Sequence, residues 1–249
     1  MQILNCCFKR PLIYTQSLCY YNMRHNYYSK SYREQNQIQL KIAGVALLIN
    51  LVMLAICVVS GFYFVFFLSL AITLSIIAPF FDVPSLKKKG SLIYYSSLFV
   101  AEKESKGVVK IHGGSLFDYV FVLDKSLNGL QRTNFILQQY VEGLLNLIND
   151  FEKRQNTTVK IQGTSYIINH RTASKLGLKV VKTDFIQKCI LVLNYIPLSI
   201  SNSFAKRKLS FPNLRNSKTF KGELVELIKR KQDLQNLNNK LQRRTSSSI

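Results

Sequence analysis

The feature that most constrains this chain is a run of forty residues, 42–81, without Asp, Glu, Lys or Arg. As one helix the run would be about 60 Å long at 1.5 Å per residue, whereas the hydrocarbon core of a bilayer is about 30 Å thick. Ser60 and Gly61 lie midway, and both residue types favour turns. We therefore expect two membrane-spanning helices, over about 41–59 and 62–81, with a reversal between them.

Two alternatives stay open for this run. A helical hairpin could be buried in a soluble core, but forty uncharged residues are hard to bury in a chain of 249 residues. A re-entrant hairpin could enter the bilayer without crossing it. Both alternatives predict a turn at the same place and differ in what covers the helices.

The flanking charges predict the orientation of the hairpin. Residues 1–41 hold six Lys and Arg against one Glu, and Lys87, Lys88 and Lys89 follow the second helix. Positive flanks tend to remain cytoplasmic, and an even number of spans places both flanks on one side. We expect an integral membrane protein with two spans and both termini in the cytoplasm. Met23 is a candidate alternative start, because residues 1–22 show no clear periodicity.

The net charge of +21 indicates the class of partner. Residues 82–249 carry 28 Lys and Arg against 12 Asp and Glu, and a basic cytoplasmic segment beside an anionic leaflet is attracted to it. An anionic lipid surface is therefore the expected partner. No helix-turn-helix, zinc-finger, RNP or KH signature is found, and the membrane already accounts for the charge, which disfavours a nucleic-acid partner.

The cysteines and histidines predict neither a disulfide framework nor a metal site. No two cysteines have C-x-x-C spacing, and the histidines are too far apart in the sequence to form a cluster. These residues are Cys6, Cys7, Cys19, Cys57, Cys189, His25, His112 and His170.

Beyond the lysines, the periodicity changes to that of a mixed α/β domain over 90–184. The first three expected strands form an antiparallel meander, Gly163 suggests a bulge in the fourth, and Asn169 and Gly177 bound a short helix. Strands are expected over 91–101, 107–113, 115–124, 159–168 and 178–184, and helices over 130–153 and 169–177.

The C-terminal part is expected to be helical and basic. Residues 185–204 carry one charge and a central Pro197, and we expect a helix that lies on the membrane surface or on the domain. Residues 205–249 hold 12 basic and 3 acidic residues and should end in a helix over about 221–244. Leucines seven residues apart in this helix could contact a protein partner. They are Leu227, Leu234 and Leu241.

The order of elements over residues 95–183 resembles the later part of a GCN5-related N-acetyltransferase domain. The segments that carry the resemblance are "LFVAEKESKGVVKI", "YVFVLD", a loop, a long helix, "VKIQGTSYII" and "NHRTASKLGLKVV". The resemblance implies an acyl-CoA cofactor whose pyrophosphate lies at the start of the long helix. The residues at that position are Asn128, Gly129 and Arg132, which are the implied cofactor contacts.

Two motifs of that family are not matched. Its phosphate loop has several glycines, which let backbone N–H groups approach the phosphates, whereas "LNGLQRTN" has Gly129 alone. The position of the family's usual tyrosine acid is Ala173 here. His112 beside Gly113 and Gly114, near Asp118, and the pair His170 and Arg171 are weaker candidates, interpreted as a strand end and a solvated helix start. No set of residues forms a complete catalytic motif.

The sequence thus predicts an α+β chain in five parts. A basic segment, 1–41, precedes a transmembrane hairpin, 42–81. A mixed α/β, acyltransferase-like cytoplasmic domain, 90–184, is followed by a surface helix, 185–204, and a basic helical tail, 205–249. The expected function is that of a membrane-anchored protein that presents a basic binding domain at the membrane surface without a cofactor. The alternative is a membrane-associated, acyl-CoA-dependent N-acyltransferase-like enzyme.

Overall fold

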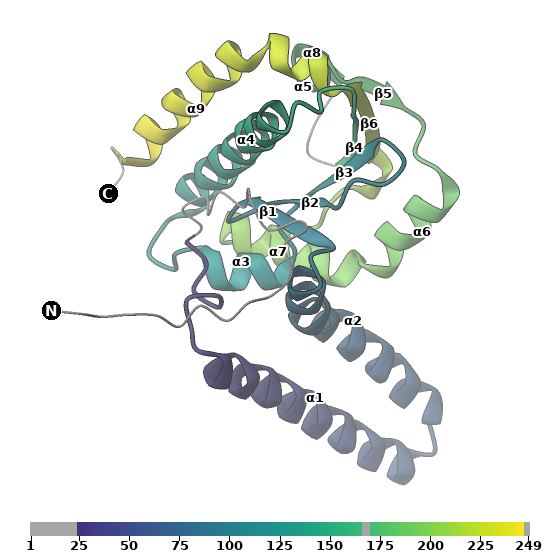
Figure 1. Ribbon diagram of the computed structural model, residues 1–249. Helices are drawn as coiled ribbons and strands as arrows, with labels where there is room; N and C mark the ends of the chain where they lie inside the picture. Colours follow the sequence, from purple (N-terminus) through teal and green to yellow (C-terminus); the bar gives the residue numbers. More distant parts are fainter. Residues whose placement is uncertain (1–23, 166–169, 247–249) are drawn as a thin grey trace, which may run out of the picture.

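The computed structural model describes residues 24–165 and 170–246 and has a mixed α+β fold (Figure 1). Two long apolar helices precede a mixed sheet that is packed with further helices. The helices are α1 (Tyr32–Ser60), α2 (Tyr63–Lys88), α3 (Leu116–Val122), α4 (Gly129–Lys153), α5 (His170–Lys175), α6 (Phe185–Leu193), α7 (Tyr195–Lys206), α8 (Leu224–Lys229) and α9 (Lys231–Ser246). The strands are β1 (Leu92–Ser96), β2 (Phe99–Glu102), β3 (Val108–Gly113), β4 (Lys160–Ser165), β5 (Lys179–Val181) and β6 (Lys218–Glu223).

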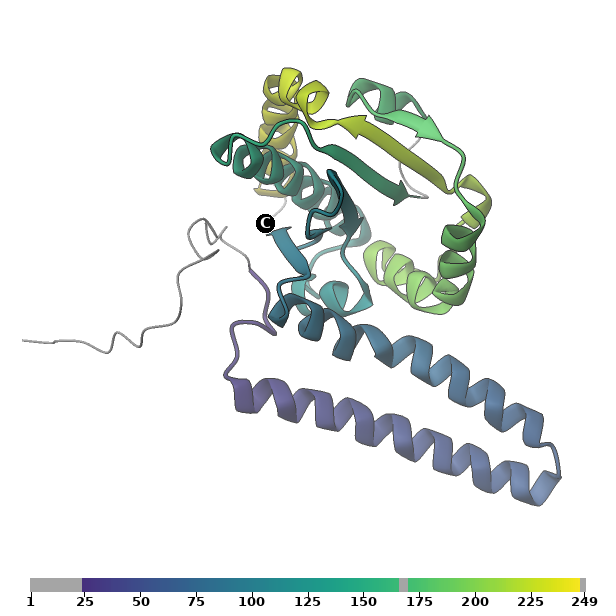
Figure 2. The same cartoon turned by 45° about the vertical axis from the view of Figure 1, so that its right-hand side comes forward.

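The chain reverses at Gly61, as the sequence predicts. Gly61 ends α1 in the left-handed conformation, with φ of 76°, and its N–H donates to the Cys57 carbonyl over 2.8 Å. Helices α1 and α2 then run side by side in opposite directions (Figures 1 and 2). The side chains of this hairpin point mostly outward, and no residue of α2 is buried. Both helices are long and apolar enough to cross a membrane.

Both helices of the hairpin are longer than predicted. Helix α1 begins early because Ser31 and Glu34 form a capping box, in which each side chain bonds the other's backbone N–H. Helix α2 continues through Pro79 and Pro84. A proline cannot donate to the carbonyl four residues before it, and for Pro84 this is the carbonyl of Phe80. The side-chain amide of Gln39 donates to that carbonyl over 3.0 Å, so α1 replaces the lost hydrogen bond.

The six-stranded sheet has the order β1-β2-β3-β4-β6-β5. Neighbouring strands are antiparallel except β3 and β4, which are parallel and are joined through α3 and α4. The parallel register runs from Val108 opposite Lys160 to Ile111 opposite Gly163. Beyond that point the partners recorded for β4 lie on β6 only.

The meander at the start of the domain is built from other segments than expected. Residues 91–101 form two strands rather than one, because the chain turns at Ser97 and Leu98 between β1 and β2. The predicted strand 115–124 is wrong, since most of it is α3. Ser115 and Asp118 form a capping box at its start, and three of its first four side chains, Leu116, Phe117 and Tyr119, are buried apolar groups. Packing on one helix face overrides the strand preference of its aromatic and β-branched residues.

The predicted bulge at Gly163 is also wrong, because β4 keeps a regular register with β6 through this residue. Close packing between neighbouring strands explains the glycine at this position instead. A Cβ at position 163 would lie 2.9 Å from the Ile111 side chain on the neighbouring strand. The last residues of the predicted strand 159–168, and the predicted cap Asn169, lie outside the described residues. Helix α5 and strand β5 are shorter than the predicted ranges 169–177 and 178–184.

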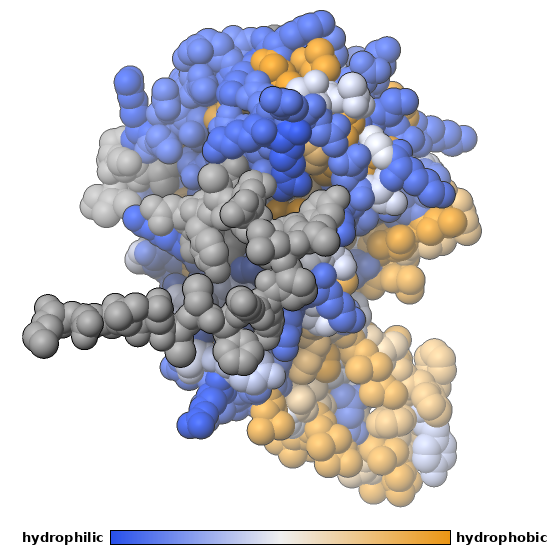
Figure 3. All heavy atoms as spheres, viewed as in Figure 1, coloured by the Kyte–Doolittle hydropathy of each residue, from blue (hydrophilic) through white to orange (hydrophobic). Residues whose placement is uncertain are grey.

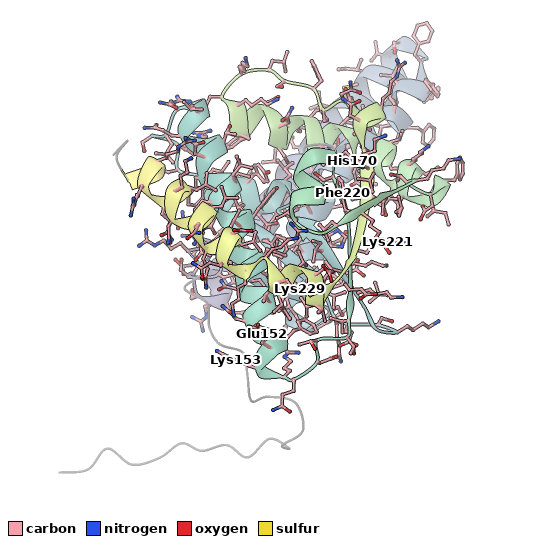
Figure 4. All side chains as sticks on the ribbon, turned by 90° about the horizontal axis from the view of Figure 1, so that it is seen from above. Glu152, Lys153, His170, Phe220, Lys221 and Lys229 are labelled. Carbon is pink, nitrogen blue, oxygen red and sulfur yellow. The ribbon has the colours of Figure 1, made fainter. Side chains whose placement is uncertain are left out.

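The predicted basic helix over 221–244 is wrong at its beginning. Strand β6 occupies 218–223 and lies between β4 and β5, where Gly222 allows the close approach of Leu178. The chain then forms α8 and α9. Leu227, Leu234 and Leu241 are all buried, and α9 lies along α4 of the same chain (Figure 4).

The core lies between the sheet and the helices α4, α8 and α9. Helix α4 matches the prediction for 130–153, and its apolar stripe includes Leu144, Leu147 and Ile148, which pack with Phe220 of β6. Glu152, which Figure 4 labels near the end of α4, pairs with Lys231 of α9. The core therefore lies on the face of the sheet that α4 covers.

The predicted helix 185–204 is divided into two. Asn194 ends α6, and its amide donates to the Ile190 carbonyl over 2.8 Å. Pro197 then lies in the first turn of α7, where its missing N–H breaks no hydrogen bond. Helix α7 packs on α3 and α4, whereas no residue of α6 is buried.

Candidate functional site

A buried polar cluster joins the base of the hairpin to the α/β domain. Asp118 of α3 lies at its centre and is 1% exposed. Its Oδ1 accepts from the Tyr94 hydroxyl over 2.5 Å and lies 3.2 Å from His25 Nε2. Its Oδ2 accepts from the backbone N–H and the hydroxyl of Ser115, over 2.6 and 2.8 Å. Since a carboxylate offers about four acceptor sites, these partners account for the hydrogen-bonding capacity of Asp118.

Aromatic rings enclose this cluster and bring in α2. His25 stacks on Phe117, with ring centroids 5.1 Å apart, and Lys87 places its ammonium 3.3 Å from the centroid of Tyr28. Burial raises the pKa of the Tyr94 hydroxyl far above its usual value, and burial also raises that of Tyr28. Both phenols therefore remain neutral at physiological pH, which suits Tyr94 as a hydrogen-bond donor to Asp118. The cluster thus connects the segment before α1, strand β1 and helices α2 and α3 through hydrogen bonds and ring contacts.

Sequence reasoning missed this cluster because its members are far apart in the chain. His25 and Asp118 are separated by 93 residues. The residues next to Tyr28 and Tyr94 in the sequence do not mark either tyrosine as part of a polar cluster. One local signal was present. The segment "SLFD", Ser115 to Asp118, has the spacing of a capping box before an apolar run, which predicts a helix start.

A pocket of about 510 Å³ adjoins the cluster, between α2, the hairpin of β1 and β2, and the end of β3. Apolar side chains from α2, β1 and β2 form one part of its lining, and polar groups, including Glu102 of β2 and His112 of β3, form the rest. This combination suits an amphipathic molecule, whose apolar part would contact the aliphatic side chains. The lining residues include Val83, Leu86, Leu92, Val100, Glu102, Lys103, His112, Ser115 and Asp118.

The structure brings His112 and Asp118 to this same pocket but gives them different partners. His112 Nε2 lies 3.0 Å from the Glu102 carboxylate, which Lys110 also contacts at 3.4 Å. These side chains are about half exposed, and exposed ion pairs contribute little. The hydroxyl of Ser115 is directed to Asp118 rather than to His112. No nucleophile–base pair is therefore formed here.

The three residues implied as cofactor contacts do lie together, at the start of α4. Asn128 caps the helix, accepting from the Gln131 N–H over 3.0 Å. At Gly129, an added Cβ would collide with the Lys206 carbonyl, so this glycine allows α7 to approach. Arg132 donates to the carbonyls of Phe204 and Lys125, over 2.8 and 3.1 Å.

The end of α7 thus covers the start of α4. Burial lowers the pKa of Arg132, and the nearby positive charge of Arg207 lowers it further. An open pocket of about 420 Å³ lies beside the two arginines and is otherwise lined mainly by Ile200, Phe204 and Leu209. The two guanidinium groups give this pocket a positive rim.

The remaining sequence candidates lie apart from both pockets. Ala173 is fully buried in the core, so a methyl group stands where the resemblance would place a tyrosine. His170 is exposed at the start of α5, and the side chain of Arg171 lies outside what the structure describes. Cys57 and Cys189 are free thiols, while Cys6, Cys7 and Cys19 fall in the part of the chain that is not described. Within residues 24–165 and 170–246, no group of three or more His, Cys, Asp and Glu is placed to hold a metal ion.

The hairpin and the domain present surfaces of opposite character (Figure 3). The hairpin is almost entirely hydrophobic, whereas the domain above it is mostly hydrophilic, with a hydrophobic area at the place of α6 and smaller ones toward the top. Arg33 and Lys41 of α1, and Lys87, Lys88 and Lys89 after the apolar part of α2, lie at the hairpin's domain end. The apolar surface therefore begins where a band of positive charge ends.

Comparison of the chain with protein-family models, with curated proteins and with solved structures finds no match. The site is therefore interpreted from its own geometry.

Proposed function

We propose that this chain is a membrane-anchored protein that holds a basic α/β domain against the anionic cytoplasmic leaflet. One observation carries the proposal. Two antiparallel apolar helices leave their side chains uncovered along their length, and basic residues flank both at the same end. Burial in a soluble core is disfavoured because, within residues 24–165 and 170–246, no residue of α2 is buried.

The charge distribution supports the cytoplasmic orientation. Lys and Arg near the ends of spans favour the cytoplasmic side, and here both ends of the hairpin that join the rest of the chain are basic. Each Lys or Arg close to an anionic leaflet contributes about 1 kcal/mol of attraction. With a net charge of +16 in residues 82–249, the domain binds an anionic surface once the hairpin places it there.

Protease protection tests this orientation. We expect tags at both termini to be shielded in sealed membranes whose cytoplasmic face is inside, and to be cleaved once the membranes are opened. As a control for anchoring, high salt should leave the protein in the membrane fraction, because screening weakens charge attraction but not helix insertion. Shielding of one tag alone would mean an odd number of spans. Release by salt would mean peripheral attachment.

A second candidate is an acyl-CoA-dependent transferase at the membrane, and one observation favours it. The parallel strands β3 and β4 are adjacent, are joined through α4, and lose their mutual register after Ile111 and Gly163. This parallel pair is one part of the arrangement that the resemblance implies, whereas its segment "YVFVLD", expected as a strand, lies mostly in helix α3. A pantetheine arm would enter where the two strands part, and Arg132 and Arg207 would face its phosphates.

Calorimetric titration of the full chain with coenzyme A tests this candidate. If it is right, binding should be saturable, and Arg207→Ala should weaken it about tenfold, since a charge-assisted hydrogen bond contributes about 1.5–3 kcal/mol. Lys240→Ala, a change of charge on the exposed side of α9, is the matched control and should leave the affinity unchanged. The absence of saturable heat, or equal weakening by both variants, would exclude the transferase.

A further inference from the structure

Helix α6 has an apolar side that no part of the described chain covers. Five of its nine side chains are both apolar and exposed, and none of its residues is buried. In Figure 3 a hydrophobic area marks the place that α6 occupies in Figure 1. The exposed apolar residues are Phe185, Ile186, Ile190, Val192 and Leu193.

The position of α6 relative to the hairpin indicates what covers this side. The hydroxyl of Ser75, on α2, donates to the Leu193 carbonyl at the end of α6 over 3.2 Å. From Tyr63 to Asp82, the first charged residue, α2 covers about 30 Å at 1.5 Å per residue, which matches a hydrocarbon core. Ser75 is seven residues from Asp82, so the end of α6 lies about 10 Å below the core boundary. Interfacial helices lie about 5–10 Å deep.

The hydrogen bonds at the end of α6 suit that depth. The last carbonyls of a helix have no partner within the helix, and inside a bilayer water cannot supply one. Here the Leu193 carbonyl accepts from Ser75, and the Ile190 carbonyl accepts from both the backbone N–H and the side-chain amide of Asn194, over 3.0 and 2.8 Å. Two exposed lysines, Lys182 and Lys188, lie just before and within α6 and can reach anionic headgroups.

We propose that α6 lies within the lipid–water interface, with its apolar side among the acyl chains. The inference rests on the membrane anchoring proposed above and goes beyond it. The hairpin alone allows the domain to pivot, whereas a second, off-axis attachment to the same leaflet fixes its tilt. The domain then has one defined face toward the lipid surface, the side that carries α6 and α7 and lies next to α2.

Depth-dependent fluorescence quenching tests this placement. The full chain, with its five cysteines replaced, would receive single cysteines labelled with an environment-sensitive dye and be reconstituted into phosphatidylcholine–phosphatidylserine vesicles. Val192→Cys and Phe185→Cys report on α6. Ala71→Cys, an exposed position at mid-length of the α2 span, is the membrane control, and Lys240→Cys, on α9, is the aqueous control.

We expect both α6 labels to lose most of their emission to lipids with a quencher partway down the acyl chain, at the depth of Ser75, and less to lipids with a quencher at the chain end. The Ala71→Cys label should show the reverse order, and the Lys240→Cys label should not respond. Quenching of the Ala71→Cys label without quenching on α6 would overturn this inference and leave the anchor intact. Loss of quenching at all sites would overturn both. Blue-shifted α6 emission that depends on protein concentration, without lipid quenching, would show that a second copy covers α6 instead.

Discussion

Leu51→Arg should move most of the protein out of the integral-membrane fraction. Leu51 is half exposed near the middle of α1, where its side chain would face acyl chains. An arginine at the centre of a span costs about 2.5–3.5 kcal/mol on insertion scales, which shifts the equilibrium between inserted and free chains about a hundredfold. No acidic residue lies in 42–81 to pair with the new charge.

Leu40→Arg is the matched control, because it makes the same change on the same helix. Leu40 is 73% exposed and adjoins Lys41, at the basic end of the hairpin. An arginine there reaches the headgroups, so its cost should be close to zero. Alkaline extraction of membranes from cells that express each variant measures the difference. Equal retention of both variants would show that α1 does not cross the bilayer.

Asp118→Ala should destabilise the α/β domain by about 3–5 kcal/mol, the usual effect of removing one member of a buried charged network. The variant leaves the Tyr94 hydroxyl, His25 and the Ser115 N–H without their acceptor in a site with almost no access to water. It also removes the capping box of α3. Because domains are stable by only about 5–15 kcal/mol, this loss is a large share of the total.

Asp124→Ala is the matched control for that measurement. Asp124 also accepts from a backbone N–H, that of Ser126 over 2.8 Å, but it is exposed. Its loss should change stability by less than about 1 kcal/mol. Urea unfolding followed by circular dichroism, in detergent, compares the two variants. Similar unfolding midpoints for Asp118→Ala and the unmodified protein would show that the cluster does not hold the domain to the hairpin.

The elements that the sequence predicted well are those specified by neighbouring residues. The hairpin follows from the absence of charge over 42–81 and from Gly61, whose positive φ needs only local freedom. Helix α4 follows from an apolar stripe that repeats every three to four residues. Each of these signals lies within a single helix or turn, so the sequence contains all of it.

The elements that only the tertiary structure decided depend on residues far apart in the chain. Residues 116–122 have strand-like composition, yet they form α3 because Ser115 and Asp118 cap it and because His25 and Tyr94 complete the hydrogen bonds of Asp118. Strand β6 forms because β4 and β5 present unpaired edges on both sides of it.

The candidate site shows the same division. The sequence placed Asn128, Gly129 and Arg132 at the start of a helix, and they are there. The end of α7 lies opposite them. Its Phe204 carbonyl, which accepts from Arg132, is 72 residues away in the chain. The local pattern of apolar residues determines which segments form helices and which side of each helix is apolar. Long-range hydrogen bonds and packing determine which polar groups meet, because each buried polar atom takes its partner from whichever segment the fold brings near.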